Sequence, residues 1–308
     1  MRNNTRAHWQ QLVDRAIAIT DNNLSLDLSI KAVADQLSVD AQTLGRRFED
    51  LKEESFKQFT KRRKLENAGG LLRHSPFSIS QIADRCGYNT IQAFSKAFAE
   101  EHELTPTAYR DRLYLPNELA TLNKTKIITS SHETEDDIFC MDNLQERQEN
   151  ATTLYYTILP SQHDPIRNMV AHMLHYIQQF RIIRSTLMIP DARIITGTLD
   201  AVPVVDYEKM MMYVGLQVPM CKAFEVIHRQ IKFGFHTCHL LEKEMPASNY
   251  KFLKVNMGFA DAGLPMYNFI NTSCRQGFFK LNSNQFFMSL TGLTECEVFI
   301  PWERRYGA

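Results

Sequence analysis

A near-repetition within the first 112 residues constrains this chain more than any other feature. The segment SIKAVADQL at 29–37 returns as SISQIADRC at 78–86. Each copy leads into a second segment with apolar residues at helical spacing, at 40–48 and at 90–98. Each unit therefore predicts a helix, a short turn and a second helix. Two such units side by side indicate a protein that reads DNA.

The register of the repeat assigns a buried face and an open face to each second helix. The copies are 49 residues apart up to the turn and 50 residues apart beyond it. The matched apolar residues then take the buried i and i+4 positions: Leu44, Phe48, Phe94 and Phe98. Polar side chains that suit bases or phosphate point the other way: Gln42, Arg46, Gln92 and Lys96. The alternative is that these side chains form an ordinary solvated helix face.

The segment between the two units, 56–72, has helical spacing and predicts a rod of roughly 25 Å. Such a rod suits two helices that enter successive major-groove faces, about 34 Å apart. The basic run at 61–64 predicts phosphate contacts, with a solvated charge run as the alternative. Gly69 and Gly70 are unexpected, because each glycine costs a helix about 1 kcal/mol relative to alanine. Either the helix frays there or its backbone passes close to another element.

Four segments of the second unit form a long, ordered signature: ISQIA at 79–83, Gly87-Tyr88, FSKAF at 94–98 and LTPTAYR at 104–110. With them, residues 24–112 resemble the AraC/XylS family of bacterial transcription regulators. The resemblance implies that the second helix of each unit is a recognition helix. It implies DNA contacts at these positions: Gln42, Gly45, Arg46, Ile91, Gln92, Ser95 and Lys96.

Three positions depart from the family pattern. Ser38 stands in the first turn where glycine is usual, Gly45 brings no side chain to a contact position, and Glu103 replaces the glycine before Thr-Pro. We therefore expect the first unit to be weaker or altered in specificity and the second unit to stay close to the pattern.

Composition limits how the chain binds DNA and where it works. The whole chain is formally neutral, and residues 1–115 carry 17 basic and 15 acidic side chains, so affinity must come from local placement of charge. The length favours two domains, and no 18-residue apolar run appears, so we expect a cytoplasmic protein with no membrane partner. Six cysteines without a Cys-x-x-Cys spacing indicate reduced thiols and no structural zinc.

Residues 116–150 have a weaker pattern, with eight acidic and three basic side chains. They predict an acidic linker with some local order, in which 127–128 and 138–139 pair as short strands.

The second half of the chain predicts the order strand, helix, strand, strand, twice over. The first set falls at 153–159, 165–184, 193–199 and 209–218, and the second at 250–256, 264–274, 277–281 or slightly later, and 296–300. The predicted fold is therefore multidomain. An all-α double helix-turn-helix domain (1–115) and the linker (116–150) precede an α+β domain of duplicated strand-helix-strand-strand units (151–308).

Three segments of this half, at 197–200, 207–219 and 295–301, resemble the gyrase-inhibitor-like (GyrI-like) effector-binding domains. The resemblance implies a groove between the two repeats that takes bulky, often cationic or aromatic, small molecules. It places an acidic position at Glu297, on the same strand face as Phe299. The candidate aromatic walls are Tyr155, Tyr156, Tyr213, Phe252 and Trp302. The alternative is that these residues are plain core and sheet surface.

Other signals are weaker. The histidines of 236–239 and the pair His172 and His175 lack a full ligand set, and the Met210-Met211-Met212 run is more typical of core than of a ligand contact. No enzyme motif appears, so we expect no catalytic residue, metal or cofactor. The sequence predicts a regulator that binds promoter DNA, senses a small molecule and acts on RNA polymerase recruitment. The alternatives are a C-terminal protein-interaction module, or a hydrolase with Glu297 as its base.

Overall fold

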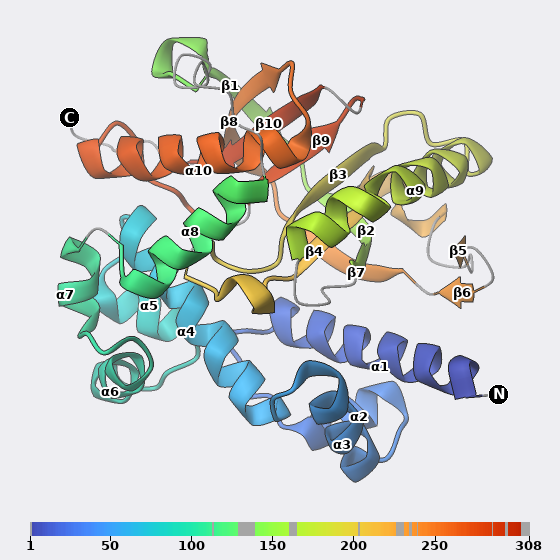
Figure 1. Cartoon of the computed structure of the whole chain (residues 1–308), viewed down its shortest axis with the longest axis horizontal. Helices are drawn as coiled ribbons and strands as arrows, with labels where there is room; N and C mark the ends of the chain where they lie inside the picture. Colours follow the sequence, from blue (N-terminus) through green and yellow to red (C-terminus); the bar gives the residue numbers. More distant parts are fainter. Residues whose placement is uncertain are drawn as a thin grey trace.

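The computed structural model describes residues 2–112, 114–128, 139–159, 165–202, 204–225, 231–233, 236–238, 240–284, 286–292 and 295–302. Its N-terminal part is helical and its C-terminal part is built on a sheet, and the two lie against each other (Figure 1). The N-terminal helices are α1 (Arg2–Asn22), α2 (Ile30–Leu37), α3 (Ala41–Lys52), α4 (Phe56–His74), α5 (Ile79–Arg85), α6 (Ile91–His102) and α7 (Pro106–Asp111). The repeat did not predict α1, which packs on α2 and α3.

The helices of the two helix-turn-helix units begin at side-chain caps. Ser29 accepts a hydrogen bond from the backbone of the third helical residue of α2, and Ser78 does the same for α5 within a full capping box. The turn after α2 places Ser38 in the left-handed region at φ 55°, and the turn after α5 places Gly87 there at φ 74°. The predicted pair of units, α2–α3 and α5–α6, is confirmed.

The glycine pair lies in an unbroken helix, because α4 runs through both residues. A Cβ on Gly69 would meet Val204 Cγ1 at 2.8 Å, and a Cβ on Gly70 would meet the Asn284 side chain at 2.7 Å. Both contacts come from the C-terminal part. Of the two alternatives, close passage of another element is therefore correct.

Residues 116–150 contain more structure than the linker prediction allowed: α8 (Pro116–Ile128), the 3-10 turn η1 (Met141–Asn143) and β1 (Gln145–Glu149). The prediction that 127–128 form a strand is wrong, because both residues end α8. The reason is tertiary: buried Glu118 in the first turn of α8 accepts hydrogen bonds from Arg73 and from the Leu115 backbone N–H, which anchors the helix. Residue 138 lies outside the described residues.

The C-terminal part holds an eight-stranded sheet whose pairings are all antiparallel. Its strands after β1 are β2 (Thr152–Ile158), β3 (Arg193–Thr198), β4 (Met212–Pro219), β7 (Leu241–Met245), β8 (Ser248–Val255), β9 (Phe287–Leu290) and β10 (Cys296–Pro301). The spatial order is β1-β8-β10-β9-β3-β4-β2-β7. Two short strands, β5 (Ile231–Phe233) and β6 (His236–Cys238), pair separately.

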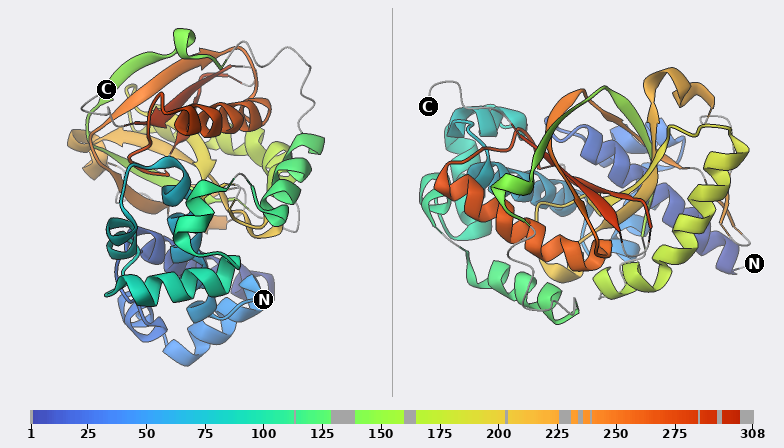
Figure 2. Two further views of the ribbon diagram at one scale, coloured as in Figure 1. Left: turned by 90° about the vertical axis from the view of Figure 1, so that its left-hand side faces the viewer. Right: turned by 90° about the horizontal axis from the view of Figure 1, so that it is seen from above.

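Helices α9 (Pro165–Thr186) and α10 (Phe259–Gln276) cover one face of the sheet (Figure 2). The largest apolar core lies between that face and the two helices. The strand expected near 277–281 lies later, as β9, because Gly277 ends α10 at φ 81°. Residues Tyr207–Lys209 form a 3-10 turn, η2, so β4 begins three residues after the predicted start.

The opposite face of the sheet, here called the inner face, meets the helical part. Its cluster of buried apolar side chains includes Leu154, Tyr156, Tyr213, Phe287 and Phe299, and it also takes in Ala18 of α1. In the other direction, Met211 from the C-terminal part is fully buried in the core of the first helix-turn-helix unit. The methionine run is thus core, and the two parts of the chain share apolar cores.

Candidate nucleic-acid interface

The two recognition helices, α3 and α6, bury one face and present the other. The apolar pairs of both helices are completely buried: Leu44, Phe48, Phe94 and Phe98. The predicted contact residues Gln42, Arg46, Ile91, Gln92 and Lys96 are exposed, and Gly45 and Ser95 are half-buried. Ile91 keeps 44% of its surface accessible. The sequence register therefore predicted the open face of each helix correctly.

The C-terminal part leaves both recognition helices open. In Figure 1, α3 and α6 lie at the end of the molecule away from the sheet, and the side view in Figure 2 shows the same arrangement. Between them runs α4, whose 19 residues span about 28 Å at 1.5 Å per residue. That length is comparable to the roughly 34 Å between successive major-groove faces on one side of a duplex.

The N-termini of the two recognition helices differ in charge. The carboxylate of Asp40 caps α3 by accepting a hydrogen bond of 2.7 Å from the Thr43 backbone N–H. Hydrogen bonds from the side chain and the backbone of Thr43 lower the pKa of Asp40. The neutral hydroxyl of Thr90 caps α6 and accepts from the Ala93 backbone at 3.1 Å. A negative cap opposes a DNA phosphate at the start of α3, whereas the start of α6 has no such charge.

The basic run at 61–64 is mostly not a phosphate contact. Arg62, Arg63 and Lys64 are buried on α4, with 7%, 3% and 7% of their surface accessible. Lys61 alone is exposed, and its ammonium lies 3.5 Å from Glu100. The prediction is therefore wrong for three of the four residues. Other elements enclose α4 on most sides and bury these side chains.

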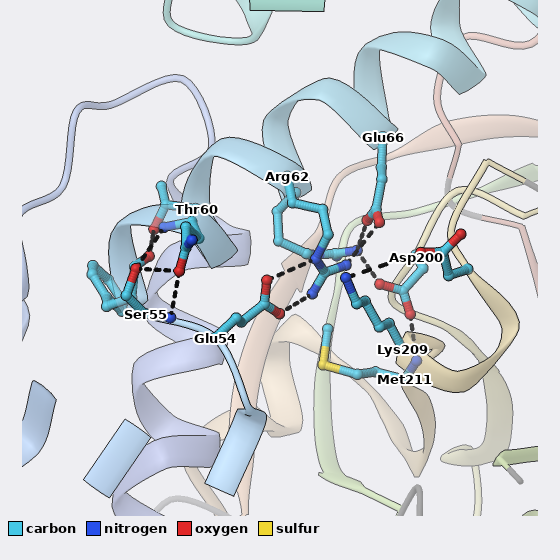
Figure 3. Close-up of polar contacts among 12 residues, drawn as sticks. Glu54, Ser55, Thr60, Arg62, Glu66, Asp200, Lys209 and Met211 are labelled. Carbon is cyan, nitrogen blue, oxygen red and sulfur yellow. Dashed lines mark hydrogen bonds and ion pairs between the residues drawn. The ribbon is translucent and has the colours of Figure 1, made fainter. Parts of the chain in front are cut away.

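Buried ion pairs compensate the charges on α4. Arg62 lies between two carboxylates, 2.5 Å from Glu54 and 2.7 Å from Glu66 (Figure 3). Arg63 donates to Asp21 of α1 at 2.9 Å and to Asp200 of the C-terminal part, and Asp200 also accepts from the Met211 backbone N–H.

Burial dominates the electrostatics of the carboxylates in this cluster. It raises the pKa of Glu66 to about 7, and it raises the pKa of Asp200 above its usual value, although Arg62 and Arg63 oppose both shifts. The cluster joins α1, α4 and the C-terminal part at one point. Sequence reasoning missed it, because the partners of Arg63 lie 42 and 137 residues away.

The predicted ligand residues divide between the two faces of the sheet. Tyr156 and Tyr213 meet edge to face on the inner face, with ring centroids 5.7 Å apart, and Phe252 packs on the same cluster. Half-buried Glu297 shares the strand face of Phe299, which is inner. Tyr155 and Trp302, by contrast, lie in the core beneath α9 and α10 and are not available to a site on the inner face.

Two arginines that the sequence analysis did not single out cover aromatic rings of the inner face. The guanidinium of Arg147 lies 4.9 Å from the ring of Phe252, and that of Arg193 lies 4.9 Å from the ring of Phe299. Arg193 is held there by two hydrogen bonds to Glu149, of 3.0 and 2.6 Å. The protein's own cations thus occupy the ring faces that an external cation would use near Glu297.

A cavity opens at the other end of the inner face, where the sheet meets α1 and α4. Tyr213 is the predicted ligand residue that lines it. Among the described residues, no group of three or more metal-ligand side chains comes together. His239, one of the two histidines of 236–239, lies outside the described residues. None of the helices that the structure describes combines the length and apolar character needed to cross a membrane.

The helical part is similar to known helix-turn-helix proteins. Residues 33–112 match a family model described as a helix-turn-helix domain. The regulatory protein PocR of Salmonella typhimurium is 29% identical over 99 residues, which make up 32% of this chain and 33% of PocR. The chain spans between 25% and 36% of the length of the curated relatives it matches.

Two solved structures are each similar to part of the chain. The C-terminal domain of AraT, a response regulator from Geobacillus stearothermophilus, is 31% identical and covers 34% of this chain and 88% of that domain, with a TM-score of 0.32. The structure of SAV2435 bound to tetraphenylphosphonium is 11% identical and covers 52% of this chain and 93% of that one, with a TM-score of 0.32. The family match covers the two helix-turn-helix units and the helix between them.

Proposed function

We propose that this protein is a transcription regulator that binds promoter DNA through two recognition helices. The base and phosphate contacts are made by Gln42, Gly45 and Arg46 of α3 and by Ile91, Gln92, Ser95 and Lys96 of α6. Arg46 and the two glutamines suit base edges in the major groove, and Lys96 suits guanine or phosphate. The second unit contributes more affinity, because α6 has a neutral cap and a fuller set of side chains.

One observation carries this proposal. In the whole chain, both recognition helices keep the predicted contact face exposed while the opposite face is completely buried. If the helices served only for packing, nothing would require an exposed polar face at matching positions of α3 and α6.

The C-terminal part is proposed to be a GyrI-like effector-binding domain of duplicated strand-helix-strand-strand units. Residues 1–115 form the DNA-binding domain, 116–150 the connection and 151–308 the effector domain. The order β2-α9-β3-β4, followed by β8-α10-β9-β10, supports this assignment, as does an inner face rich in aromatic rings. Effector binding changes promoter affinity or RNA polymerase recruitment.

The DNA-binding proposal is tested with the double variant Arg46→Ala, Lys96→Ala. Each substitution removes one contact worth about 1–3 kcal/mol, so affinity for a promoter duplex should fall by at least about tenfold. The slope of log affinity against log salt should become shallower by about 1 to 2. Fluorescence anisotropy over a salt series measures both quantities.

A matched control removes two cations from the sheet-based part. Lys209 and Lys254 are exposed, like Arg46 and Lys96, and pair only loosely with Asp206 and Glu295, at 3.9 and 3.8 Å. The double variant Lys209→Ala, Lys254→Ala should retain wild-type affinity and salt slope. Equal losses in both double variants would show that net charge, and not the recognition helices, accounts for binding.

A second candidate role for the C-terminal part is contact with another protein. One side of α9 carries exposed apolar residues at positions four and eight apart, Val170, Leu174 and Ile182, with 48%, 49% and 58% of their surface accessible. Such a row is typical of a helix that packs against a partner.

A further inference from the structure

The buried ion pairs that join the DNA-binding helices to the C-terminal part are unbalanced in charge. We call this group the joint cluster, and its two guanidiniums belong to Arg62 and Arg63 of α4. Its four carboxylates have side chains no more than 12% exposed, and they belong to Asp21, Glu54, Glu66 and Asp200. With all four ionised, two negative charges would lack a guanidinium partner. Buried charge without compensation is costly, so the joint cluster favours uptake of a proton.

The charged groups around the joint cluster compensate this excess only weakly. Further ionisable side chains that act on it are Asp14 of α1, Lys52 of α3, Tyr156 of β2 and Lys243 of β7. Burial lowers the pKa of both lysines, raises the pKa of Asp14 to about 6 and raises the pKa of Tyr156, which stays neutral. Lys209 of η2, drawn near the joint cluster in Figure 3, is 48% exposed and lies 3.9 Å from Asp206.

Glu66 and Asp200 compete for one donor atom. Nη1 of Arg63 donates both to Oε2 of Glu66, at 3.4 Å, and to Oδ1 of Asp200. The other oxygen of each carboxylate has a donor of its own, which is Nη1 of Arg62 for Glu66 and the Met211 backbone N–H for Asp200. A proton on Oε2 of Glu66 would remove one negative charge and leave Nη1 of Arg63 to Asp200. Asp21 is outside this competition, because it accepts from Nε and Nη2 of Arg63.

We propose that Glu66 holds a proton near neutral pH, and that loss of this proton loosens the joint between the DNA-binding helices and the C-terminal part. Ionised Glu66 competes with Asp200 for Arg63, and Arg63 is the side chain that ties α4 to α1 and to the C-terminal part. The consequence for DNA rests on the proposed DNA-binding function. A looser joint fixes the separation of α3 and α6 less firmly, so DNA affinity falls as pH rises.

Unfolding of the full chain across a pH series tests the proton on Glu66 without DNA. Burial raises the pKa of Glu66 to about 7 in the folded protein, so the folded state binds a proton that the unfolded chain releases. The stability that this proton confers is complete below the pKa of the unfolded carboxyl and is lost as pH rises through about 7. In that window this proton should raise the unfolding equilibrium constant by up to about tenfold per pH unit.

Glu66→Gln keeps the shape of a protonated glutamic acid and cannot ionise. Its stability relative to the wild type should therefore improve from about pH 5 to about pH 8. The control Glu295→Gln removes an exposed carboxylate that lies 3.8 Å from Lys254, and its relative stability should not change with pH. If Glu66 were instead an ionised partner of both arginines, Glu66→Gln would lose relative stability as pH rises. That result, or a pH-independent difference, overturns the inference.

Infrared difference spectra guard against misfolding of Glu66→Gln. A protonated carboxyl has a C=O stretch that an ionised carboxylate lacks. The wild type should lose one such band between about pH 6 and about pH 8, Glu295→Gln should lose it too, and Glu66→Gln should not have it. No loss in the wild type overturns the inference, as does a loss that persists in Glu66→Gln or disappears in Asp21→Asn.

DNA affinity over the same pH range tests the coupling to DNA reading. Fluorescence anisotropy should show that the affinity of the wild type for a promoter duplex falls as pH rises, and that the affinity of Glu66→Gln falls less. Equal pH dependence in the two proteins overturns this coupling. Absence of DNA binding at every pH would instead overturn the proposed DNA-binding function, and it would leave the unfolding and infrared results to decide the proton on Glu66.

Discussion

Each helix-turn-helix unit places one residue of its turn in the left-handed region, although the second turn is one residue longer. Ser38 ends α2 at φ 55° and Gly87 follows α5 at φ 74°, and Glu53 and Glu103 end the two recognition helices at φ 57° each. A residue other than glycine in this region costs about 1–2 kcal/mol. Ser38 in the first turn therefore carries strain that Gly87 in the second turn does not. What distinguishes the first unit is its reading face, where Gly45 brings no side chain.

Two single substitutions, Ser38→Gly and Gly87→Ser, test whether Ser38 is strained. Ser38→Gly should raise the free energy of unfolding by up to about 1 kcal/mol, because it relieves the left-handed strain. Gly87→Ser should lower the free energy of unfolding by more, because its Cβ would also clash with the Ser25 carbonyl oxygen. Denaturant unfolding measures both variants. A loss of stability in Ser38→Gly would contradict the strain account.

Helix α4 is the element that joins DNA reading to the C-terminal part. Fifteen of its 19 residues are buried. Toward the first unit its Arg63 reaches Asp200, and toward the second unit the Asn67 carbonyl and side-chain oxygens each accept a hydrogen bond of 2.9 Å from Asn284. Gly70 leaves the space in which Asn284 makes these bonds. The two glycines thus lower the helix propensity of α4 and allow close contact with Val204 and Asn284 of the C-terminal part.

The variant Gly70→Ala should therefore be less stable than the wild type, although alanine favours a helix more than glycine does. In an open helix the change would add about 1 kcal/mol, but here Asn284 must move and lose its bonds to Asn67. The control is Gly45→Ala in α3, where the nearest atom to a new Cβ lies 3.9 Å away, and it should be stabilising. Thermal unfolding measures the stability of both variants. Equal stabilisation of both would mean that Asn284 is not held against α4.

Local patterns predicted the elements that follow a regular period, and long-range contacts decided the rest. Spacing of Leu44 with Phe48 and of Phe94 with Phe98 predicted the buried faces of α3 and α6, and alternation predicted most strands of the sheet. The burial of Arg63 was not predictable, because it depends on Asp200, which lies 137 residues away. Likewise, alternation places Tyr155 and Tyr156 on opposite faces of the sheet, but it does not say which face packs against the helical part.

At the scale of the whole molecule, the C-terminal part holds both helix-turn-helix units. Met211 enters the core of the first unit, and the backbone N–H of Leu281 donates to the His74 carbonyl at the end of α4, at 2.8 Å. Arg275 of α10 donates to the Arg112 carbonyl, just beyond α7, at 3.2 Å. Contacts at both ends of α4 fix the separation and the relative rotation of the two recognition helices, while leaving their reading faces open.

We propose that α3 and α6 read two half-sites as one rigid pair, and DNA affinity as a function of half-site spacing tests this most directly. Duplexes carry the promoter sequence with either no insertion or roughly 5 base pairs, about half a turn, between the half-sites. The insertion turns one half-site to the opposite side of the duplex. We predict that affinity then falls to that of a duplex with a single half-site. Unchanged affinity across the insertion would contradict the account.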